Sequence, residues 1–275
     1  PILPHELSRE GPGLAVGDVD GNGLDDVFVG ADRGDRAVLF RQTANGQFRR
    51  DPLANSRRYE DRGALFFDAD GDGDQDLYVV SGGPVRAPDR TVYQDRLYRN
   101  DNGTLRLVPD ALPDMDASGS VVTAADYDRD GDLDLFVGGR VRPDEYPLPP
   151  QSYLLRNDSD EGTVRFTDVT DEQAPGLAEI GLVTDALWTD YNEDGRRDLM
   201  VVGEWMPITI FRNEGDGFSK ATKQAGLNDT NGWWMSLAAG DLDRDGGTDY
   251  AAGNPGGHTP SSATPRPPAP GPATV

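Results

Sequence analysis

The sequence predicts an all-β protein made of repeated four-stranded antiparallel sheets. Three observations predict this class. An acidic motif, D-x-[DN]-x-[DN]-G-x-x-D, occurs five times in 275 residues, with starts 50, 58, 64 and 51 residues apart. A short, mostly apolar segment follows each copy, and turn sequences rich in Asn, Asp and Gly separate the later segments. A self-similar period of this length is typical of repeat architectures.

The third repeat shows the expected elements in order. Residues 119–125 (GSVVTAA) predict a strand that enters the acidic loop, and residues 135–141 (LFVGGRV) predict the strand that leaves it. Residues 152–157 and 163–170 predict two further strands, with the turn NDSDEG between them. Short segments rich in β-branched and aromatic residues, bounded by turn residues, are typical of strands.

The other repeats follow the same order. The second has ALFFDADGDGDQDLYVV and then DRLYRNDNGTLRLV; the fourth has ALWTDYNEDGRRDLMVV and then ITIFRNEGDGFSKAT. The turns ANGQF, NDNGT and EGDGF have the Asn/Asp-Gly chemistry of tight hairpins. Four short antiparallel strands in each repeat are the blade of a β-propeller. The fifth repeat stops after GDLDRDGGTDYAAGN, so we expect four blades plus part of a fifth within residues 1–254.

The spacing inside each acidic motif is that of a calcium loop. Calcium takes six to eight oxygen ligands, and side chains at loop positions 1, 3 and 5 converge when the backbone curls around an ion. Position 6 is glycine in every copy, position 7 would offer a backbone carbonyl, and position 9 is always aspartate. The candidate ligands at positions 1, 3, 5, 7 and 9 are Asp18, Asp20, Asn22, Leu24 and Asp26; Asp68, Asp70, Asp72, Asp74 and Asp76; Asp126, Asp128, Asp130, Asp132 and Asp134; Asp190, Asn192, Asp194, Arg196 and Asp198; and Asp241, Asp243, Asp245, Gly247 and Asp249.

Two other interpretations of the motif are less favoured. An EF-hand closes with a bidentate glutamate at position 12 and continues into a helix. Position 12 is valine or alanine in all five copies, and the segments that follow predict strands. One such motif alone could be an acidic surface turn. Five copies that keep every key position favour calcium binding, with up to five Ca²⁺ ions.

Composition limits the classes of partner. The chain has 49 acidic and 26 basic residues, a formal net charge of −23, which suits neither nucleic acid nor an anionic membrane surface. It has no cysteine, so disulfides and thiolate sites are excluded. No apolar run is long enough to span a membrane, so we expect no membrane insertion. Extracellular calcium modules bind at roughly 10⁻⁴ to 10⁻³ M, which favours an extracellular, periplasmic or cell-surface location.

The loops and their flanking strands resemble FG-GAP/VCBS repeats, the units of the integrin α-subunit propeller. The resemblance covers about residues 5 to 254. GALFFDADGD, LFVGGRVRPDEYPLPPQSYLLRN, LVTDALWTDY, VVGEWMPITIFRN and GWWMSLAAGD resemble a narrower group, the bacterial VCBS-repeat proteins related to cartilage acidic protein, which often have an ASPIC/UnbV domain. The resemblance implies a secreted or surface-attached, calcium-stabilised propeller of about seven blades. Asn22 and Asn192 depart from the family's aspartates; each keeps an oxygen ligand and loses a charge.

The propeller is therefore expected to be incomplete, an open arc whose uncovered faces and strand edges promote association. Closure by four or five blades is the less favoured alternative, because residues 255–275 contain seven prolines and no strand pattern. That composition predicts a disordered tail, either a linker to another domain or a segment foreign to the fold.

A binding role is favoured over catalysis. The two histidines, His5 and His258, lie in the N-terminal extension and in the proline-rich tail, and the remaining acids are scattered. We therefore expect a protein- or glycan-binding adhesion scaffold and no enzyme. The alternative is a carbohydrate-active enzyme, a polysaccharide lyase or hydrolase, or its accessory binding module.

Three connecting segments are rich in large apolar residues: 140–153, 203–207 and 231–236. Tyr146 and Trp205 are the candidate ligand-binding residues in them. Trp233 and Trp234 precede a predicted strand, so packing between blades is the favoured interpretation for these two.

Overall fold

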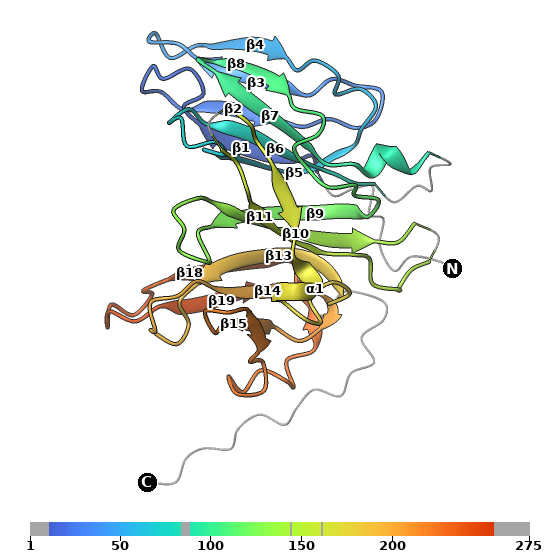
Figure 1. Cartoon of the computed structure of the whole chain (residues 1–275), viewed down its shortest axis with the longest axis vertical. Coiled ribbons are helices and arrows are strands. Elements are labelled where there is room, and N and C mark those ends of the chain that lie inside the picture. The colour runs from blue at the N-terminus through green and yellow to red at the C-terminus, as the bar shows by residue number, and fades with distance from the viewer. Residues whose placement is uncertain (1–10, 84–88, 144, 161, 256–275) are drawn as a thin grey trace.

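A computed structural model describes residues 11–83, 89–143, 145–160 and 162–255 (Figure 1). Nearly all regular structure within these ranges is β-strand. The proline-rich tail that the sequence predicts to be disordered lies outside the described residues, apart from Pro255. The strands are β1 (Leu14–Gly17), β2 (Asp26–Val29), β3 (Val38–Gln42), β4 (Phe48–Pro52), β5 (Asp61–Phe67), β6 (Asp76–Ser81), β7 (Arg96–Asp101), β8 (Thr104–Leu107), β9 (Ser118–Ala125), β10 (Asp134–Val141), β11 (Tyr153–Asn157), β12 (Phe166–Asp168), β13 (Leu182–Thr189), β14 (Asp198–Met206), β15 (Thr209–Asn213), β16 (Phe218–Lys220), β17 (Gly232–Trp233), β18 (Ser236–Gly240) and β19 (Asp249–Gly253).

These strands form four four-stranded antiparallel sheets and one two-stranded sheet. The orders are β1-β2-β3-β4, β5-β6-β7-β8, β9-β10-β11-β12, β13-β14-β15-β16 and β18-β19, and β17 adds to the fourth sheet beside β14. Each acidic motif joins the first strand of a sheet to its second strand. The predicted blades are therefore confirmed in number and strand order, including the partial fifth.

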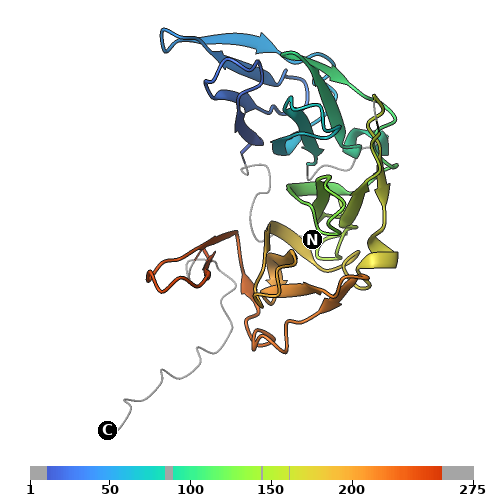
Figure 2. The same cartoon turned by 60° about the vertical axis from the view of Figure 1, so that its left-hand side comes forward.

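The sheets are arranged as an open arc (Figure 2). First strands of successive sheets lie against each other: β1 against β5, β5 against β9, β9 against β13, and β13 against β18. Small residues permit this approach, because a Cβ on Gly63 would lie 2.8 Å from the carbonyl oxygen of Ser120. The hydroxyl of Ser120 in turn donates to the carbonyl of Val183 at 2.8 Å, and the hydroxyl of Thr184 donates to Trp234 at 2.8 Å. The described residues thus form an incomplete propeller, as predicted.

The hydrophobic core lies between the sheets. Each of its three large clusters combines side chains from two neighbouring sheets, for example Phe28 with Tyr98, Tyr78 with Leu155, and Phe136 with Phe211. These side chains are almost completely buried. Burying a large apolar side chain contributes about 1.5–3 kcal/mol, so the sheets stabilise one another. A sheet at the end of the arc lacks one of these partners.

One expected strand is shorter than predicted. The sequence predicts a strand over residues 163–170, but β12 begins at Phe166 and ends at Asp168, and the short helix α1 (Thr170–Gln173) follows. The carboxylate of Asp168 accepts hydrogen bonds from both the amide and the hydroxyl of Thr170, which turns the chain out of the sheet. A 3₁₀ turn, Arg90–Tyr93, also lies between β6 and β7. No helix in the described part of the chain is long and apolar enough to cross a membrane.

Candidate metal loops and an exposed aromatic cluster

The five acidic motifs form five similar loops, which we number loop 1 to loop 5. Three carboxylates come together in four of them, with one oxygen of each within 4.8 Å of the others. They occupy positions 1, 3 and 9: Asp18, Asp20 and Asp26; Asp68, Asp70 and Asp76; Asp126, Asp128 and Asp134; and Asp241, Asp243 and Asp249. An ion bound by oxygens at 2.3–2.6 Å fits a group of this size. In loop 4, Asn192 takes position 3, so only two of these three positions are acidic.

The loop backbone is left-handed at two positions. Position 6 is glycine as the sequence predicts, with φ between +81° and +104° in the five loops. Position 4 is also left-handed in every loop, which the sequence analysis missed. The residues at position 4 are Gly21, Gly71, Arg129, Glu193 and Arg244, with φ between +58° and +74°. In the sequence, only the glycines at position 4 of loops 1 and 2 indicate a left-handed backbone there.

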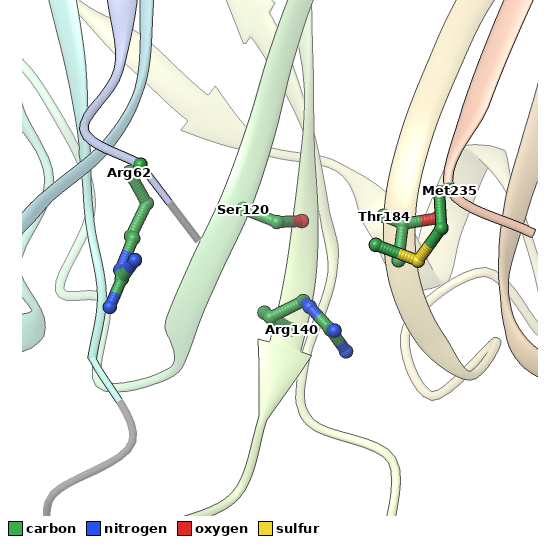
Figure 3. Close-up of a pocket in the computed structure, with 6 residues that line it drawn as sticks. Arg62, Ser120, Arg140, Thr184 and Met235 are labelled. Atoms are coloured by element: carbon green, nitrogen blue, oxygen red, sulfur yellow. The ribbon is translucent and has the colours of Figure 1, made fainter. Parts of the chain in front are cut away.

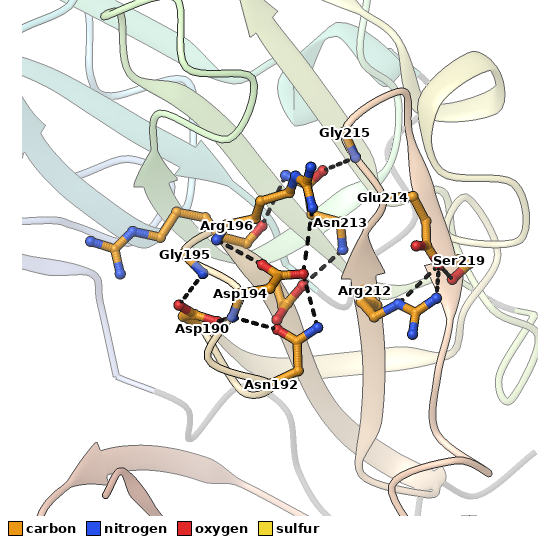
Figure 4. A network of polar contacts seen from close by, with 12 residues as sticks. Asp190, Asn192, Asp194, Gly195, Arg196, Arg212, Asn213, Glu214, Gly215 and Ser219 are labelled. Carbon is orange, nitrogen blue, oxygen red and sulfur yellow. Dashed lines mark hydrogen bonds and ion pairs between the residues drawn. The ribbon is translucent and has the colours of Figure 1, made fainter. Parts of the chain in front are cut away.

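Hydrogen bonds within the loop hold its curl. In loop 4 the position-1 carboxylate of Asp190 accepts from the amides of Asp194 at 2.9 Å and Gly195 at 2.7 Å (Figure 4). Position 5 accepts from the position-7 amide in every loop, at 2.8–3.0 Å. Position-5 side chains are therefore engaged in the turn. They lie outside the acidic groups described above. That the position-7 carbonyls are calcium ligands stays a prediction.

The position-9 aspartate joins the loop to the sheet. Asp134 is fully buried; one carboxylate oxygen accepts from the amide of Tyr127 in the loop at 3.3 Å, and the other accepts from the amide of Asn157 in β11 at 2.9 Å. Asp26, Asp76 and Asp198 make the same pair of contacts. This residue type thus supports the fold whether or not an ion is bound.

A buried asparagine links each of loops 1, 2 and 3 to the next sheet. The side-chain amide of Asn157 donates to the carbonyl of Ala69 in loop 2 at 3.0 Å and to Leu133 in loop 3 at 3.3 Å. Asn100 bonds Val19 in loop 1 in the same way, and Asn213 bonds Tyr127 in loop 3. Val19, Ala69 and Tyr127 each hold position 2 of the loop in the preceding sheet. These residues were not predicted from the sequence, where their signal is an Arg-Asn pair that recurs in β7, β11 and β15.

The donor set fits calcium. Burial, together with neighbouring carboxylates, raises the pKa of Asp76 and of Asp134 from 3.8 to about 7. Oδ1 of Asp70 and Oδ1 of Asp126 are buried and have no hydrogen-bond partner among the described residues. An unpaired buried acceptor costs about 1–3 kcal/mol, and a cation would satisfy it. A bound Ca²⁺ would be held by positions 1, 3 and 9 and would neutralise their mutual repulsion.

Loop 4 has a different charge balance (Figure 4). The position-5 carboxylate of Asp194 has a lowered pKa, because it accepts from the amide of Arg196 and from the side chain of Asn192. The guanidinium of Arg196 lies 3.6 Å from the same carboxylate. Arg129 of loop 3 also donates to the carbonyl of Gly195. A neutral ligand and a nearby cation both weaken cation binding, so loop 4 is the least favourable of the five for calcium.

Tyr146 and Trp205, chosen from the sequence as ligand-binding residues, lie together. Nε1 of Trp205 donates to the hydroxyl oxygen of Tyr146 at 2.7 Å, and that hydroxyl donates to Glu204 at 3.2 Å. The carboxylate of Glu204 is buried and paired with Arg140. The ring of Trp205 lies 5.1 Å from that of Trp233, at 41° to it. We call Tyr146, Trp205 and Trp233 the aromatic cluster.

The backbone turns Trp205 outward. The pairing of β14 with β17 shifts register between Glu204 and Met206, so Trp205 lies in a bulge, and its φ is +63°. A bulge re-aims a side chain, and positive φ is unusual for a bulky residue. As a result the Trp205 side chain is 49% exposed, whereas Trp233 is buried, as expected for a packing residue. Trp234 is partly buried and its indole donates to the carbonyl of Thr230 at 2.9 Å.

A pocket lies where the first strands converge (Figure 3). Its volume is 190 Å³, and its lining includes Arg62, Ser120, Arg140, Thr184 and Met235. The two arginines are already paired with carboxylates, Arg62 with Glu60 and Arg140 with Glu204. This pocket therefore belongs to the polar packing at the centre of the arc.

The family follows from the repeats. A model of the FG-GAP-like repeat matches residues 18–79, 68–137 and 190–252. The chain belongs to the FG-GAP repeat family. These three matches contain all five loops in full. The acidic loops are thus part of the FG-GAP repeats themselves.

Individual proteins are also similar to this chain in sequence or in fold. The chain is 28% identical to cartilage acidic protein 1 from Xenopus tropicalis over 216 residues. The match covers 74% of this chain and 31% of that protein. The structure is similar to a lectin from Agrocybe aegerita that recognises non-reducing terminal N-acetylglucosamine, with a TM-score of 0.50 and 17% identity over 89% of this chain and 60% of the lectin. It is also similar to the V. cholerae biofilm matrix protein Bap1, with a TM-score of 0.40 and 14% identity over 88% and 34% of the two chains. The lectin likeness supports the fold.

Proposed function

We propose that this chain is part of an extracellular, calcium-stabilised scaffold that binds a glycan or protein through the aromatic cluster and does not turn it over. The observation that carries the proposal is the exposed ring of Trp205, which donates a hydrogen bond to Tyr146 and packs at a tilt beside the ring of Trp233. Large, rigid aromatic side chains give contact area at a low cost in conformational entropy, and they dominate many binding surfaces.

The strained backbone supports the same assignment. A bulky residue at positive φ costs about 1–3 kcal/mol, and such strain is concentrated at functional sites. Here the strain places an indole in solvent, where it adds little to the core. The ring's flat apolar face can stack on the apolar face of a sugar or on a partner's side chain, while the buried Glu204–Arg140 pair holds the support in place.

The proposed role of calcium is structural. Asp198 is the first residue of β14 and Trp205 is near its end, so the loop and the aromatic cluster lie at opposite ends of one strand. Seven residues of extended strand separate them by about 23 Å. Ions in the loops therefore stabilise the sheets without contacting the ligand. Membership of the FG-GAP family and similarity to a cartilage protein support an extracellular setting.

A glycan and protein array, probed in calcium and in chelator, tests the function. The panel should include glycans that end in N-acetylglucosamine, the sugar that the similar lectin recognises. For the best ligand, Trp205→Ala is expected to weaken binding at least tenfold without changing the melting temperature. Phe48→Ala is the matched control, because Phe48 is also 49% exposed and lies in the first sheet.

Three outcomes would overturn the proposal. Trp205→Ala could bind as tightly as the parent, or the whole panel could give no saturable binding. Release of new reducing ends or unsaturated sugars from a bound polysaccharide would instead identify a carbohydrate-active enzyme.

A further inference from the structure

The outer edge of β19 has no strand beside it among the described residues. In the other four sheets the equivalent strands, β2, β6, β10 and β14, each pair with a third strand. The fifth sheet has only β18 and β19 and lies at one end of the arc (Figure 2). We call this edge, formed by Asp249–Gly253, the fifth-sheet edge. It presents backbone donors and acceptors that another strand can pair with.

An apolar cavity lies between the fourth and fifth sheets. Its volume is 490 Å³, and its lining includes Met200, Ile210, Leu227, Leu237 and Tyr250. At the other three junctions between sheets, one large side chain from the third strand is buried against the preceding sheet. These side chains are Tyr98, Leu155 and Phe211, each no more than 1% exposed. The cavity therefore occupies the place that a third strand fills elsewhere.

Polar groups at this junction show the same pattern. The position-2 carbonyls of loops 1, 2 and 3 each accept from the third-strand asparagine of the next sheet. Tyr191 holds position 2 in loop 4, and the fifth sheet offers no third-strand asparagine within the described residues. One carboxylate oxygen of Asp249 accepts from Leu242 at 2.9 Å, as in the other loops. In loops 1 to 4 the other oxygen of the position-9 aspartate accepts from a third-strand amide, and β19 has no third strand beside it among the described residues.

Three of the four existing third strands, β7, β11 and β15, share a motif that defines what would fit. Each has a large apolar residue two positions before the asparagine, an arginine between them and an acidic residue after: Tyr-Arg-Asn-Asp at 98–101, Leu-Arg-Asn-Asp at 155–158, and Phe-Arg-Asn-Glu at 211–214. In each, the arginine pairs with the acidic residue across the asparagine. A basic residue at this point also complements the acidic loop beside it.

We propose that the fifth-sheet edge is a docking site for a β-hairpin of a partner polypeptide. Its first strand pairs antiparallel with β19, its large apolar side chain enters the cavity, and its asparagine bonds the carbonyl of Tyr191. Main-chain pairing supplies affinity and the side-chain pocket supplies specificity, as in other cases of strand addition. Residues 256–275 do not suit this role, because their sequence contains six prolines and neither an aromatic residue nor an asparagine.

A synthetic hairpin with the sequence of residues 208–220, ITIFRNEGDGFSK, is the probe. Labelled with fluorescein, it is expected to bind the calcium-loaded chain with saturable anisotropy. The same peptide with Asn213→Ala or Phe211→Ala should bind at least tenfold more weakly, and a peptide of residues 256–275 should not compete. Amide hydrogen exchange at residues 249–253 should slow when the probe is bound.

Two protein variants distinguish loss of binding at the fifth-sheet edge from a general effect of added charge. Ala252 lines the cavity and Ala251 is exposed beside it on the opposite face of β19. Ala252→Arg is expected to weaken probe binding at least tenfold, and Ala251→Arg less than twofold. Equal binding of the parent and Asn213→Ala peptides, or no binding at 1 mM probe, would overturn the proposal. A dimer in light scattering that the probe dissociates would assign the edge to a second copy of this chain instead.

Discussion

Nε1 of Trp205 donates a 2.7 Å hydrogen bond to the hydroxyl oxygen of Tyr146, 59 residues away in the sequence. The same hydroxyl donates to the buried carboxylate of Glu204. Burial raises the pKa of Tyr146, so the hydroxyl keeps its proton and both contacts at neutral pH. One phenol thus fixes the exposed indole to a buried ion pair.

Tyr146→Phe is therefore expected to loosen Trp205 without disturbing the core. The ring and its packing remain, while the indole loses its acceptor and Glu204 loses a donor. Ligand binding should weaken by about 1–2 kcal/mol, roughly a factor of five to thirty, because one charge-assisted and one neutral hydrogen bond are lost. Trp fluorescence should shift, and the calcium-dependent gain in melting temperature should be unchanged. A fall in that gain would show that the cluster is core packing.

The metal prediction contrasts positions 3 and 9 of one loop. Asp128→Ala is expected to remove one ion in calorimetry, and to reduce only the melting-temperature gain that calcium produces. At a Kd of roughly 0.1–1 mM, 1 mM calcium contributes about 0.4–1.4 kcal/mol per site. Asp134→Ala should also lower the melting temperature in chelator, since Asp134 holds two backbone amides. Asp110→Ala, an exposed acid outside the loops, is the control. Calorimetry without calcium binding would refute the metal assignment.

Calcium binding should depend on pH through Asp76 and Asp134. Without metal their folded-state pKa values, about 7, lie above the ordinary value of 3.8, so the folded state holds more protons between these limits. Their protonation therefore stabilises the metal-free fold at low pH, and this contribution is lost as pH rises through about 7. Calcium competes with the same protons. The difference in melting temperature between calcium and chelator should be large at pH 8 and small at pH 5; an equal difference would contradict the prediction.

Asn157→Ala should destabilise the protein by about 3 kcal/mol. The change removes the partner of the Ala69 carbonyl at a buried contact, and of the Leu133 carbonyl and the Ser159 amide at partly buried contacts. Urea unfolding in saturating calcium measures the loss. Asn228→Ala, at an exposed asparagine whose side chain donates to its neighbour Asp229, should change stability by less than about 0.5 kcal/mol. Equal effects of the two changes would remove the role assigned to Asn157.

Position 4 of the loops offers a reciprocal pair of substitutions. Glu193→Gly relieves a left-handed glutamate, φ +58°, and should stabilise the chain by about 0.5–1 kcal/mol. Gly71→Glu imposes the same strain in loop 2, where an added Cβ would meet no atom within 4 Å, and should destabilise the chain by a similar amount. The comparison belongs in urea unfolding at saturating calcium. Changes of the same sign in both variants would show that backbone strain does not govern this position.

The sequence predicts the blades well because two signals are local. The acidic loop fixes where each first strand ends, and hairpin turns such as ANGQF fix the later ones. The contribution of Asn100, Asn157 and Asn213 could not be predicted from one repeat, since their acceptors lie more than 80 residues earlier in the chain. The meeting of Tyr146 with Trp205 likewise depends on how two sheets stack. The left-handed backbone at Arg129 and Arg244 carried no signal, because neither residue prefers that conformation.

The asparagine links also affect how repeat units can be duplicated and can diverge in evolution. Each asparagine bonds a main-chain carbonyl, so the acceptor can be Val19, Ala69 or Tyr127 without loss of the contact. A unit that recognises its neighbour's backbone makes no demand on that neighbour's side chain at the point of contact. Duplicated units can therefore diverge in sequence, or be inserted and deleted as whole segments of a gene, while the junction between them still forms.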